Sequence, residues 1–223
     1  MGSKIELKAA DGFALAGYKA EAVGKPKGAL VVVQEIFGVN HHIRNVVDRF
    51  AAQGYTALAP ALFDRAQRDV DVGYDKEGIA LGIEVRGKIK LEDTLLDLTA
   101  AIQHLKPAGK IGMIGYCWGG SLSFISAARL TGLSCAVGYY GSMIAAHAEE
   151  KPTVPVMLHF GEKDSGIPMT DVDNVRKARP EVEIFTYPAD HGFNCDERGS
   201  FHEESQKLAL SRSLDFLQKH LAS

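Results

Sequence analysis

Alternating apolar and polar residues open the chain, and longer apolar runs follow them. Residues 5–22, with the sequence IELKAADGFALAGYKAEA, alternate on both sides of Asp11-Gly12. This dipeptide is typical of tight turns, so the stretch predicts a β-hairpin. Later runs are rich in β-branched and other apolar residues, which favours strands that are covered on both faces of a sheet. Such strands are expected within residues 28–38, 55–63, 110–117, 135–141, 154–164 and 182–193.

Apolar residues spaced three and four positions apart predict helices between these strands. The sequence LEDTLLDLTAAIQHLK is plainly amphipathic, and Asn40 is placed to cap an earlier helix that Gly54 ends. Helices are therefore expected within residues 41–54, 91–106, 118–130, 170–178 and 202–221. The segment from Asp64 to Lys90 is polar, weakly periodic and broken by glycines, and its pattern is the least legible of the chain.

An opening hairpin followed by alternating strands and helices predicts the α/β class, with a mostly parallel central sheet and helices on both faces. The 223 residues suit one large domain, and no internal repeat or linker divides them. We therefore expect a single domain over residues 1–223. Ligands of such sheets bind beyond the carboxyl ends of the strands, so polar residues at those ends are the candidates for chemistry.

The sequence GYCWGG puts a cysteine at the corner between a predicted strand and a predicted helix. Cys117 stands where the G-x-S-x-G motif has its serine nucleophile. That motif needs a tight turn, for which Gly115 and Gly119 leave room, while Gly120 lets the helix approach the sheet. The helix N-terminus would favour the thiolate, and the N–H of Trp118 would be one oxyanion-hole donor. A buried structural cysteine in a glycine-rich turn is the alternative interpretation.

An acid and a histidine follow Cys117 in the order nucleophile, acid, histidine. Asp164 lies where the apolar run ending in LHFGEKD passes into a loop, and His191 follows the run ending in YPAD. Taken alone, each would be read as a structural loop residue. Together with Cys117 they project from one predicted sheet edge, in the chain order of the α/β-hydrolase fold. We therefore expect a catalytic triad in which Asp164 orients the His191 imidazole and His191 exchanges a proton with the thiol.

Glu35 follows the apolar run LVVVQ and precedes a glycine-containing loop. In α/β hydrolases this loop supplies the second oxyanion-hole N–H, which we assign to Ile36. A carboxylate buried there needs a proton or a cation, so Glu35 could accept the proton of Cys117; a solvent-exposed strand-end glutamate is the alternative. Phe37 and Trp118 flank the proposed oxyanion hole, and either could line an apolar substrate pocket or simply pack.

The overall charge gives no sign of a macromolecular partner. Lys and Arg number 25 against 28 Asp and Glu, a formal net charge of −3, and 46% of the residues are hydrophobic. We expect a small-molecule partner, and neither nucleic acid nor membrane. The first residues contain no apolar signal core, and no run reaches the roughly 18 residues of a membrane span, so a cytoplasmic protein is expected. Three unpaired cysteines suit a reducing compartment, and no metal-ligand spacing is present.

Motifs spread over nearly the whole chain resemble one known family. They are QEIFGVN, YTALAPALF, GKIGMIGYCWGG, AVGYYG, HFGEKDSGIP, DHGFNCDERGSFH and SRSLDFL. GYCxGG together with EIFG is the specific part, because most α/β hydrolases have serine and lack that glutamate. The chain resembles the dienelactone hydrolases, also called carboxymethylenebutenolidases. The resemblance implies an α/β-hydrolase fold without a large lid, acting as a monomer with no metal and no cofactor.

The resemblance also implies the roles of the site residues. Cys117 would be the nucleophile, Asp164 and His191 would complete the triad, and Glu35 would contact the thiol. The implied reaction is the opening of an enol-lactone ring through a thioester intermediate that water then hydrolyses. An enolate is a good leaving group, which suits sulfur, since sulfur attacks readily and expels poor leaving groups slowly.

Members of this family bind the substrate carboxylate with two arginines, and the sequence departs from that pattern. Cys195 stands where the second arginine is expected, and Arg198 comes three places later. Arg65, Arg68 and Arg86 are possible replacements for the first arginine, none in clear register. Arg86 and Arg198 are therefore the candidate substrate-binding arginines.

Two further functions are compatible with the same residues. One is a broader carboxylesterase or thioesterase that uses the same triad. The other is a reactive-thiol binding or redox-sensing protein, for which Cys195 is the candidate partner of Cys117, provided the two sulfurs lie within disulfide distance.

Overall fold

The computed structural model describes residues 1–222, which form two compact units, residues 1–111 and residues 112–222. The first unit contains β1 (Ser3–Lys8), β2 (Ala14–Ala20), β3 (Gly28–Val33), α1 (His41–Ala52), β4 (Tyr55–Pro60), a 3₁₀ turn (Leu62–Arg65), α2 (Lys76–Gly87), α3 (Leu91–Leu105) and a 3₁₀ turn (Lys106–Ala108). β5 (Ile111–Tyr116) begins at the boundary, and the second unit continues with α4 (Trp118–Arg129), β6 (Cys135–Tyr139), a 3₁₀ turn (Ala145–His147), β7 (Val156–Gly161), α5 (Met169–Ala178), β8 (Glu183–Tyr187) and α6 (Glu203–Leu221). A single domain over residues 1–223 stays a prediction, and Ser223 lies outside the described residues.

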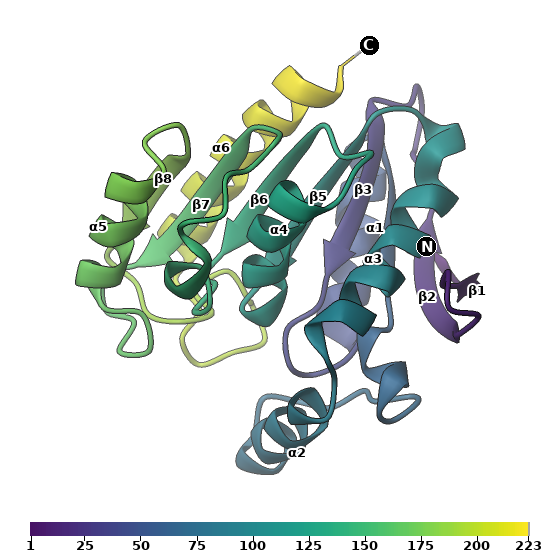
Figure 1. The fold of residues 1–223 in the computed structure, drawn as a ribbon, viewed down its shortest axis with the longest axis horizontal. Coiled ribbons are helices and arrows are strands. Elements are labelled where there is room, and N and C mark those ends of the chain that lie inside the picture. Colours follow the sequence, from purple (N-terminus) through teal and green to yellow (C-terminus); the bar gives the residue numbers. More distant parts are fainter. Residues whose placement is uncertain (223) are drawn as a thin grey trace. The chain divides into compact units, whose positions relative to one another are not determined.

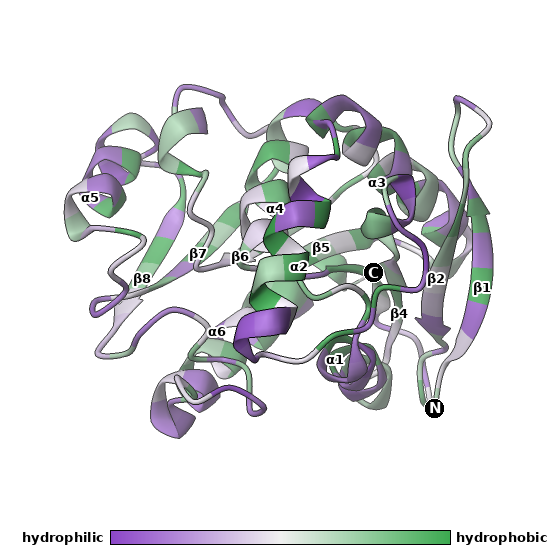
Figure 2. Ribbon diagram, turned by 90° about the horizontal axis from the view of Figure 1, so that it is seen from below, coloured by the Kyte–Doolittle hydropathy of each residue, from purple (hydrophilic) through white to green (hydrophobic). Residues whose placement is uncertain are grey.

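The predicted N-terminal hairpin is confirmed in the first unit. β1 and β2 pair antiparallel with Leu7 opposite Leu15, β2 pairs antiparallel with β4, and β4 pairs parallel with β3. Residues of β1 alternate between hydrophilic and hydrophobic (Figure 2), as expected of a strand with one buried face. β3 and β4 are buried along their whole length, and α1 and α3 lie on opposite sides of these strands (Figure 1).

Helix α1 begins where the sequence predicts. The Asn40 side chain accepts a hydrogen bond from the N–H of Ile43 at 3.1 Å, and the chain turns out of the helix at Gly54, whose φ is +94°. Helix α2 arises from the segment whose pattern was not legible. Asp75 caps it by accepting from the N–H of Gly78 at 2.7 Å, and its buried stripe includes Gly82, so this face carries little hydrophobic signal.

The second unit is built on parallel strands. β6 pairs with β5 and with β7, and β7 pairs with β8, so their carboxyl ends lie at one edge. Helix α4 lies in front of these strands and α6 behind them (Figure 1), which confirms helices on both faces of this unit. Among residues 1–222, no helix combines the length and the apolar character that crossing a membrane requires.

Candidate active site

Cys117 occupies a strained turn between β5 and α4. Its backbone angles are φ 54° and ψ −115°, a conformation that costs a non-glycine residue of order 1–3 kcal/mol. The turn is held by a hydrogen bond from the Cys117 N–H to the carbonyl of Tyr139 at 3.0 Å. A Cβ on Gly115 would lie 2.0 Å from the carbonyl oxygen of Gly119, and one on Gly120 would lie 2.2 Å from that of Tyr139. The glycines therefore permit the turn, as the sequence predicts.

The side chain of Cys117 stands at the head of α4. The helix begins at the next residue, Trp118, so the positive end of its dipole lies beside Cys117, and Cys117 is partly exposed to solvent. Trp118 itself is 7% exposed. Because Trp118 directly follows Cys117 in the chain, its backbone N–H lies where the oxyanion-hole donor is expected.

Asp164 and His191 are brought together beyond the ends of β7 and β8. The Nδ1–H of His191 donates to Oδ2 of Asp164 at 2.7 Å, and Oδ1 of Asp164 accepts from the N–H of Gly166 at 2.9 Å. Asp164 is 5% exposed, so the carboxylate is held on both oxygens in a buried setting. The imidazole packs beside the ring of Tyr140, with 5.0 Å between ring centroids.

The environment of His191 favours its protonated form. Burial alone lowers the pKa of His191, but the hydrogen bond to Asp164 and the hydrogen bond and charge of Cys117 outweigh it and raise the pKa to about 10. The imidazole therefore interacts with both Asp164 and the thiol. A cysteine, a histidine and an aspartate in this arrangement can transfer a proton between sulfur and nitrogen while the acid fixes the ring.

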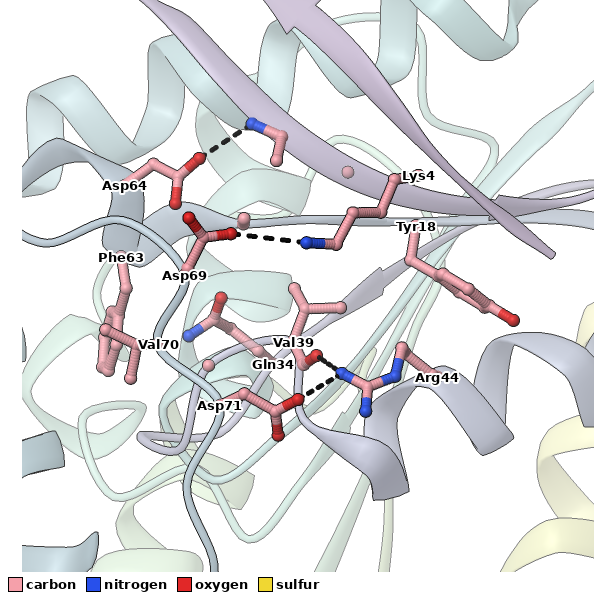
Figure 3. Close-up of a pocket in the computed structure, with 14 residues that line it drawn as sticks. Lys4, Tyr18, Gln34, Val39, Arg44, Phe63, Asp64, Asp69, Val70 and Asp71 are labelled. Carbon is pink, nitrogen blue, oxygen red and sulfur yellow. Dashed lines mark hydrogen bonds and ion pairs between the residues drawn. The ribbon is translucent and has the colours of Figure 1, made fainter.

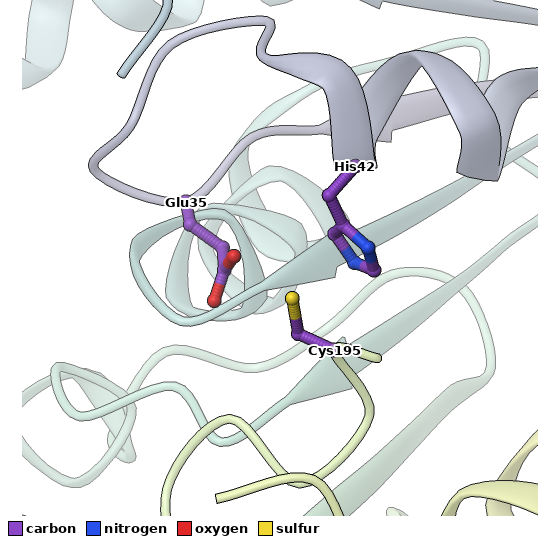
Figure 4. A group of neighbouring side chains, drawn as sticks. All are labelled: Glu35, His42 and Cys195. Carbon is purple, nitrogen blue, oxygen red and sulfur yellow. The ribbon is translucent and has the colours of Figure 1, made fainter. Parts of the chain in front are cut away.

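Glu35 lies in the first unit, on the loop after β3 (Figure 4). Its side chain is buried, with 1% exposed. The hydroxyl of Tyr74 donates to its Oε2 at 3.1 Å. A carboxylate oxygen of Glu35 and a ring nitrogen of His42, in the first turn of α1, lie within 4.8 Å of one another. Glu35 is therefore not the solvent-exposed glutamate of the alternative interpretation, and Tyr74 is a contact that the sequence pattern gave no signal for.

Ile36 and Phe37 follow Glu35 on the same loop. Ile36 is half-buried, and Phe37 is 2% exposed with its ring edge-on to that of Tyr74 at 4.5 Å between centroids. Phe37 thus has a packing partner within the first unit.

Of the candidate arginines, Arg65 is engaged in ion pairs, whereas Arg86 and Arg198 are the two proposed to bind substrate. Arg65 donates to the carboxylates of Asp97 and Asp11, so an ion-pair network of the first unit engages it. Arg86 is half-buried in the last turn of α2. Arg198 lies against Gly192: a Cβ there would be 2.7 Å from a guanidinium nitrogen. Arg198 is thereby held beside the residue that follows His191, whereas Arg65 has a structural role.

Cys135, Cys195 and His159 are fully buried. Cys117, Cys135 and Cys195 are free thiols. Burial raises the pKa of the Cys135 thiol to about 12, which suits a core residue. His159 is fully buried and accepts or donates hydrogen bonds at both ring nitrogens, to Tyr187 at 2.8 Å and Ser213 at 3.0 Å.

A separate cavity of about 180 Å³ lies in the first unit (Figure 3). Lys4 pairs with Asp69 at its rim, and Arg44 pairs with Asp71. Among the described residues that line it, none is a predicted site residue. We therefore assign it no part in the chemistry.

Comparison with known proteins identifies the family of this chain. A model of the dienelactone hydrolase family matches residues 15–221. The chain belongs to the dienelactone hydrolase family. It is similar to a protein of Pseudomonas putida named carboxymethylenebutenolidase, with 30% identity over 96% of this chain and 94% of that protein. It is also similar to a Synechocystis protein named "Putative carboxymethylenebutenolidase", with 35% identity over 93% of this chain and 92% of the other.

Solved structures of the family share the fold. A structure from Klebsiella pneumoniae, named "Putative Dienelactone Hydrolase", superimposes with a TM-score of 0.84 and 31% identity, covering 96% of this chain and 98% of the other. This member of the dienelactone hydrolase family therefore has the α/β-hydrolase fold and is a hydrolase of ester or lactone bonds. Its partner is a small-molecule ester or lactone substrate.

Proposed function

We propose that this protein opens activated enol lactones, such as dienelactones, by nucleophilic catalysis through Cys117. The thiolate attacks the lactone carbonyl carbon, the ring C–O bond breaks, and the departing enolate takes the proton held by His191. Water then attacks the resulting thioester with His191 as general base, releasing the carboxylate and restoring the thiol. Asp164 keeps the imidazole in one orientation throughout.

One observation carries this proposal. The hydrogen bond of 2.7 Å between His191 and Asp164 lies in the same unit as the strained turn at Cys117, and Cys117 itself contributes to the raised pKa of His191. A cysteine that only packed would not need positive φ at a helix N-terminus. The arrangement supports a Cys117 thiolate that the protonated imidazole stabilises.

We further propose that Glu35 accepts the thiol proton when substrate binds and that the N–H groups of Ile36 and Trp118 form the oxyanion hole. The burial of Glu35 supports a role in chemistry, since carboxylates are rarely kept out of water without a partner or a function. Phe37, Arg86 and Arg198 are proposed as substrate-binding residues, of which Arg198 is supported by its position against Gly192.

Steady-state hydrolysis of an enol lactone, an aryl ester and an acyl thioester tests the proposal. We expect the enol lactone to have the highest kcat/KM and Cys117→Ala to lose activity on all three. Glu35→Gln should lower kcat, and Arg198→Met should raise KM for anionic substrates only. Comparable turnover of all three classes would favour the broader esterase function, and full activity of Cys117→Ala would remove the nucleophile assignment.

The protein is also proposed to act as a monomer in the cytoplasm, without metal or cofactor. Light scattering after size exclusion should give the mass of one chain, and activity should survive dialysis against a chelator. A dimer mass, or loss of activity that a metal ion restores, would contradict this proposal.

A further inference from the structure

A segment of the first unit, residues 70–82, lies along the loop of residues 35–38, and we call this segment the strap. The N–H of Val72 donates to the carbonyl of Phe37 at 3.3 Å. The strap comes from the part of the chain with no legible pattern, and it contacts the loop that carries Glu35 and the proposed oxyanion donor. Its contacts therefore help to position Glu35 and Ile36.

Two glycines bring the strap and the loop into backbone contact. Gly38 has φ +76°, and a Cβ there would lie 1.8 Å from the carbonyl oxygen of Val70. A Cβ on Gly82 would lie 1.9 Å from the carbonyl oxygen of Ile36. The strap thus approaches the loop at Ile36 and at Gly38 too closely for a side chain at either glycine.

The side chain of Tyr74, in the strap, forms a hydrogen bond with Glu35. Which of the two groups donates can be derived from Asn40. Asn40 Oδ1 accepts the N–H of Ile43 as the cap of α1, so its Nδ2 must be the donor on the other side. Nδ2 lies 3.3 Å from the Tyr74 hydroxyl and 3.2 Å from the carbonyl of Val72. The hydroxyl accepts from Asn40, so its own proton points to Oε2 of Glu35 at 3.1 Å.

The ring of Tyr74 has a separate anchor. It packs edge-on against Phe37 with 4.5 Å between centroids, and the His42 ring lies 6.4 Å away. The phenol is therefore held by packing as well as by Asn40, and loss of the hydroxyl alone would leave the ring in place. This separates the hydrogen bond from the packing in an experiment.

We propose that Asn40 and Tyr74 form a positioning relay for Glu35. The cap of α1 orients the Asn40 amide, Asn40 orients the Tyr74 hydroxyl, and that hydroxyl orients the Glu35 carboxylate. The relay holds the Glu35 carboxylate in one orientation, with its Oε2 on the Tyr74 hydroxyl. This inference rests on the role proposed for Glu35. Tyr74 is a positioning residue, because it acts through Glu35.

The test is a double-mutant cycle of Tyr74→Phe and Glu35→Gln, with kcat and KM measured on an aryl ester. Tyr74→Phe keeps the ring and removes the hydroxyl, and we expect kcat to fall about tenfold with KM within about twofold. In the Glu35→Gln background, Tyr74→Phe should change kcat by less than about twofold. Tyr18→Phe is the matched control, since its hydroxyl donates to Oδ2 of Asp48 at 3.0 Å. It should leave kcat unchanged.

The possible outcomes distinguish failure of the Asn40–Tyr74 relay from failure of the role proposed for Glu35. Wild-type kcat in Tyr74→Phe, with an impaired Glu35→Gln, overturns the relay alone. Multiplicative losses in the double variant also overturn it, because the two residues would then act independently. Full activity of Glu35→Gln removes the role of the carboxylate and the relay together. Thermal melting of each variant confirms that the fold persists, and loss of kcat in Tyr18→Phe would show a merely structural effect.

Discussion

The Nδ1 of His191 lies 2.7 Å from Oδ2 of Asp164, and the other oxygen of Asp164 accepts the N–H of Gly166 at 2.9 Å. The carboxylate is thereby fixed from two directions, and it fixes the imidazole in turn. Because Nδ1 is engaged, Nε2 is the nitrogen available for proton transfer to the leaving group and from water. This relationship determines what each site substitution should do.

Replacing Asp164 by asparagine should reduce kcat/KM by about 10²- to 10⁴-fold, because the imidazole loses its anionic partner. The pKa of His191 should fall from its raised value, since the hydrogen bond to Asp164 is the largest of the contributions that raise it. Steady-state kinetics and an NMR titration of His191 measure both effects. Asp173→Asn, at an exposed residue paired with Arg176, is the control and should change neither. An unaltered titration of His191 would contradict the account.

Replacing Gly120 by alanine should destabilise the protein by about 1–3 kcal/mol. The new Cβ would lie 2.2 Å from the carbonyl oxygen of Tyr139, which also accepts the N–H of Cys117. Gly199→Ala is the control, because a Cβ there meets no atom within 4 Å, and its effect should stay within about 0.5 kcal/mol. Urea unfolding gives both values. Equal stability of the two variants would show that the close approach at Gly120 is absent.

Two glycines of α2 give a matched pair in one helix. Gly82→Ala should lower the unfolding free energy despite the better helix propensity of alanine, because its Cβ would lie 1.9 Å from the Ile36 carbonyl oxygen. Gly87→Ala meets no neighbour within 4 Å and should be neutral or stabilising by up to about 1 kcal/mol. Denaturant midpoints distinguish them. A stabilising Gly82→Ala would contradict the close approach of Gly82 to the carbonyl oxygen of Ile36.

The buried His159 should make stability depend on pH on the acid side. Burial, and to a lesser extent Arg212, lowers the pKa of His159 to about 3. This folded value lies below the unfolded one of about 6.5, so the stabilisation is complete above pH 6.5 and is lost as the pH falls toward 3. Unfolding free energies between pH 7 and 4 should fall more steeply in wild type than in His159→Gln, by about 1 kcal/mol per pH unit. Parallel pH curves would contradict a neutral buried imidazole.

The fold and the strand-end positions of Cys117, Asp164 and His191 could be predicted from sequence because their signals are local. Glycines around Cys117 mark the turn, and loops directly after apolar runs mark Asp164 and His191. Each of these residues could be placed at a strand end before any contact was known.

Helix α2 and Tyr74 were not accessible, for physical reasons. The buried face of α2 is made partly of Gly78 and Gly82, which carry no hydrophobic side chain and so give no helical periodicity. Tyr74 contacts Glu35 across 39 positions of sequence, through a hydroxyl that only the folded first unit orients. A single tyrosine in a glycine-interrupted stretch gives no sign of such a contact.

The most direct test of the central claim is to trap the acyl-enzyme. Wild-type protein mixed with an aryl ester and quenched in acid within milliseconds should gain the mass of the acyl group, and peptide mapping should locate it on Cys117 as a thioester that hydroxylamine removes. Cys117→Ala should gain no mass. Acylation of another residue, or undiminished hydrolysis by Cys117→Ala, would contradict the account.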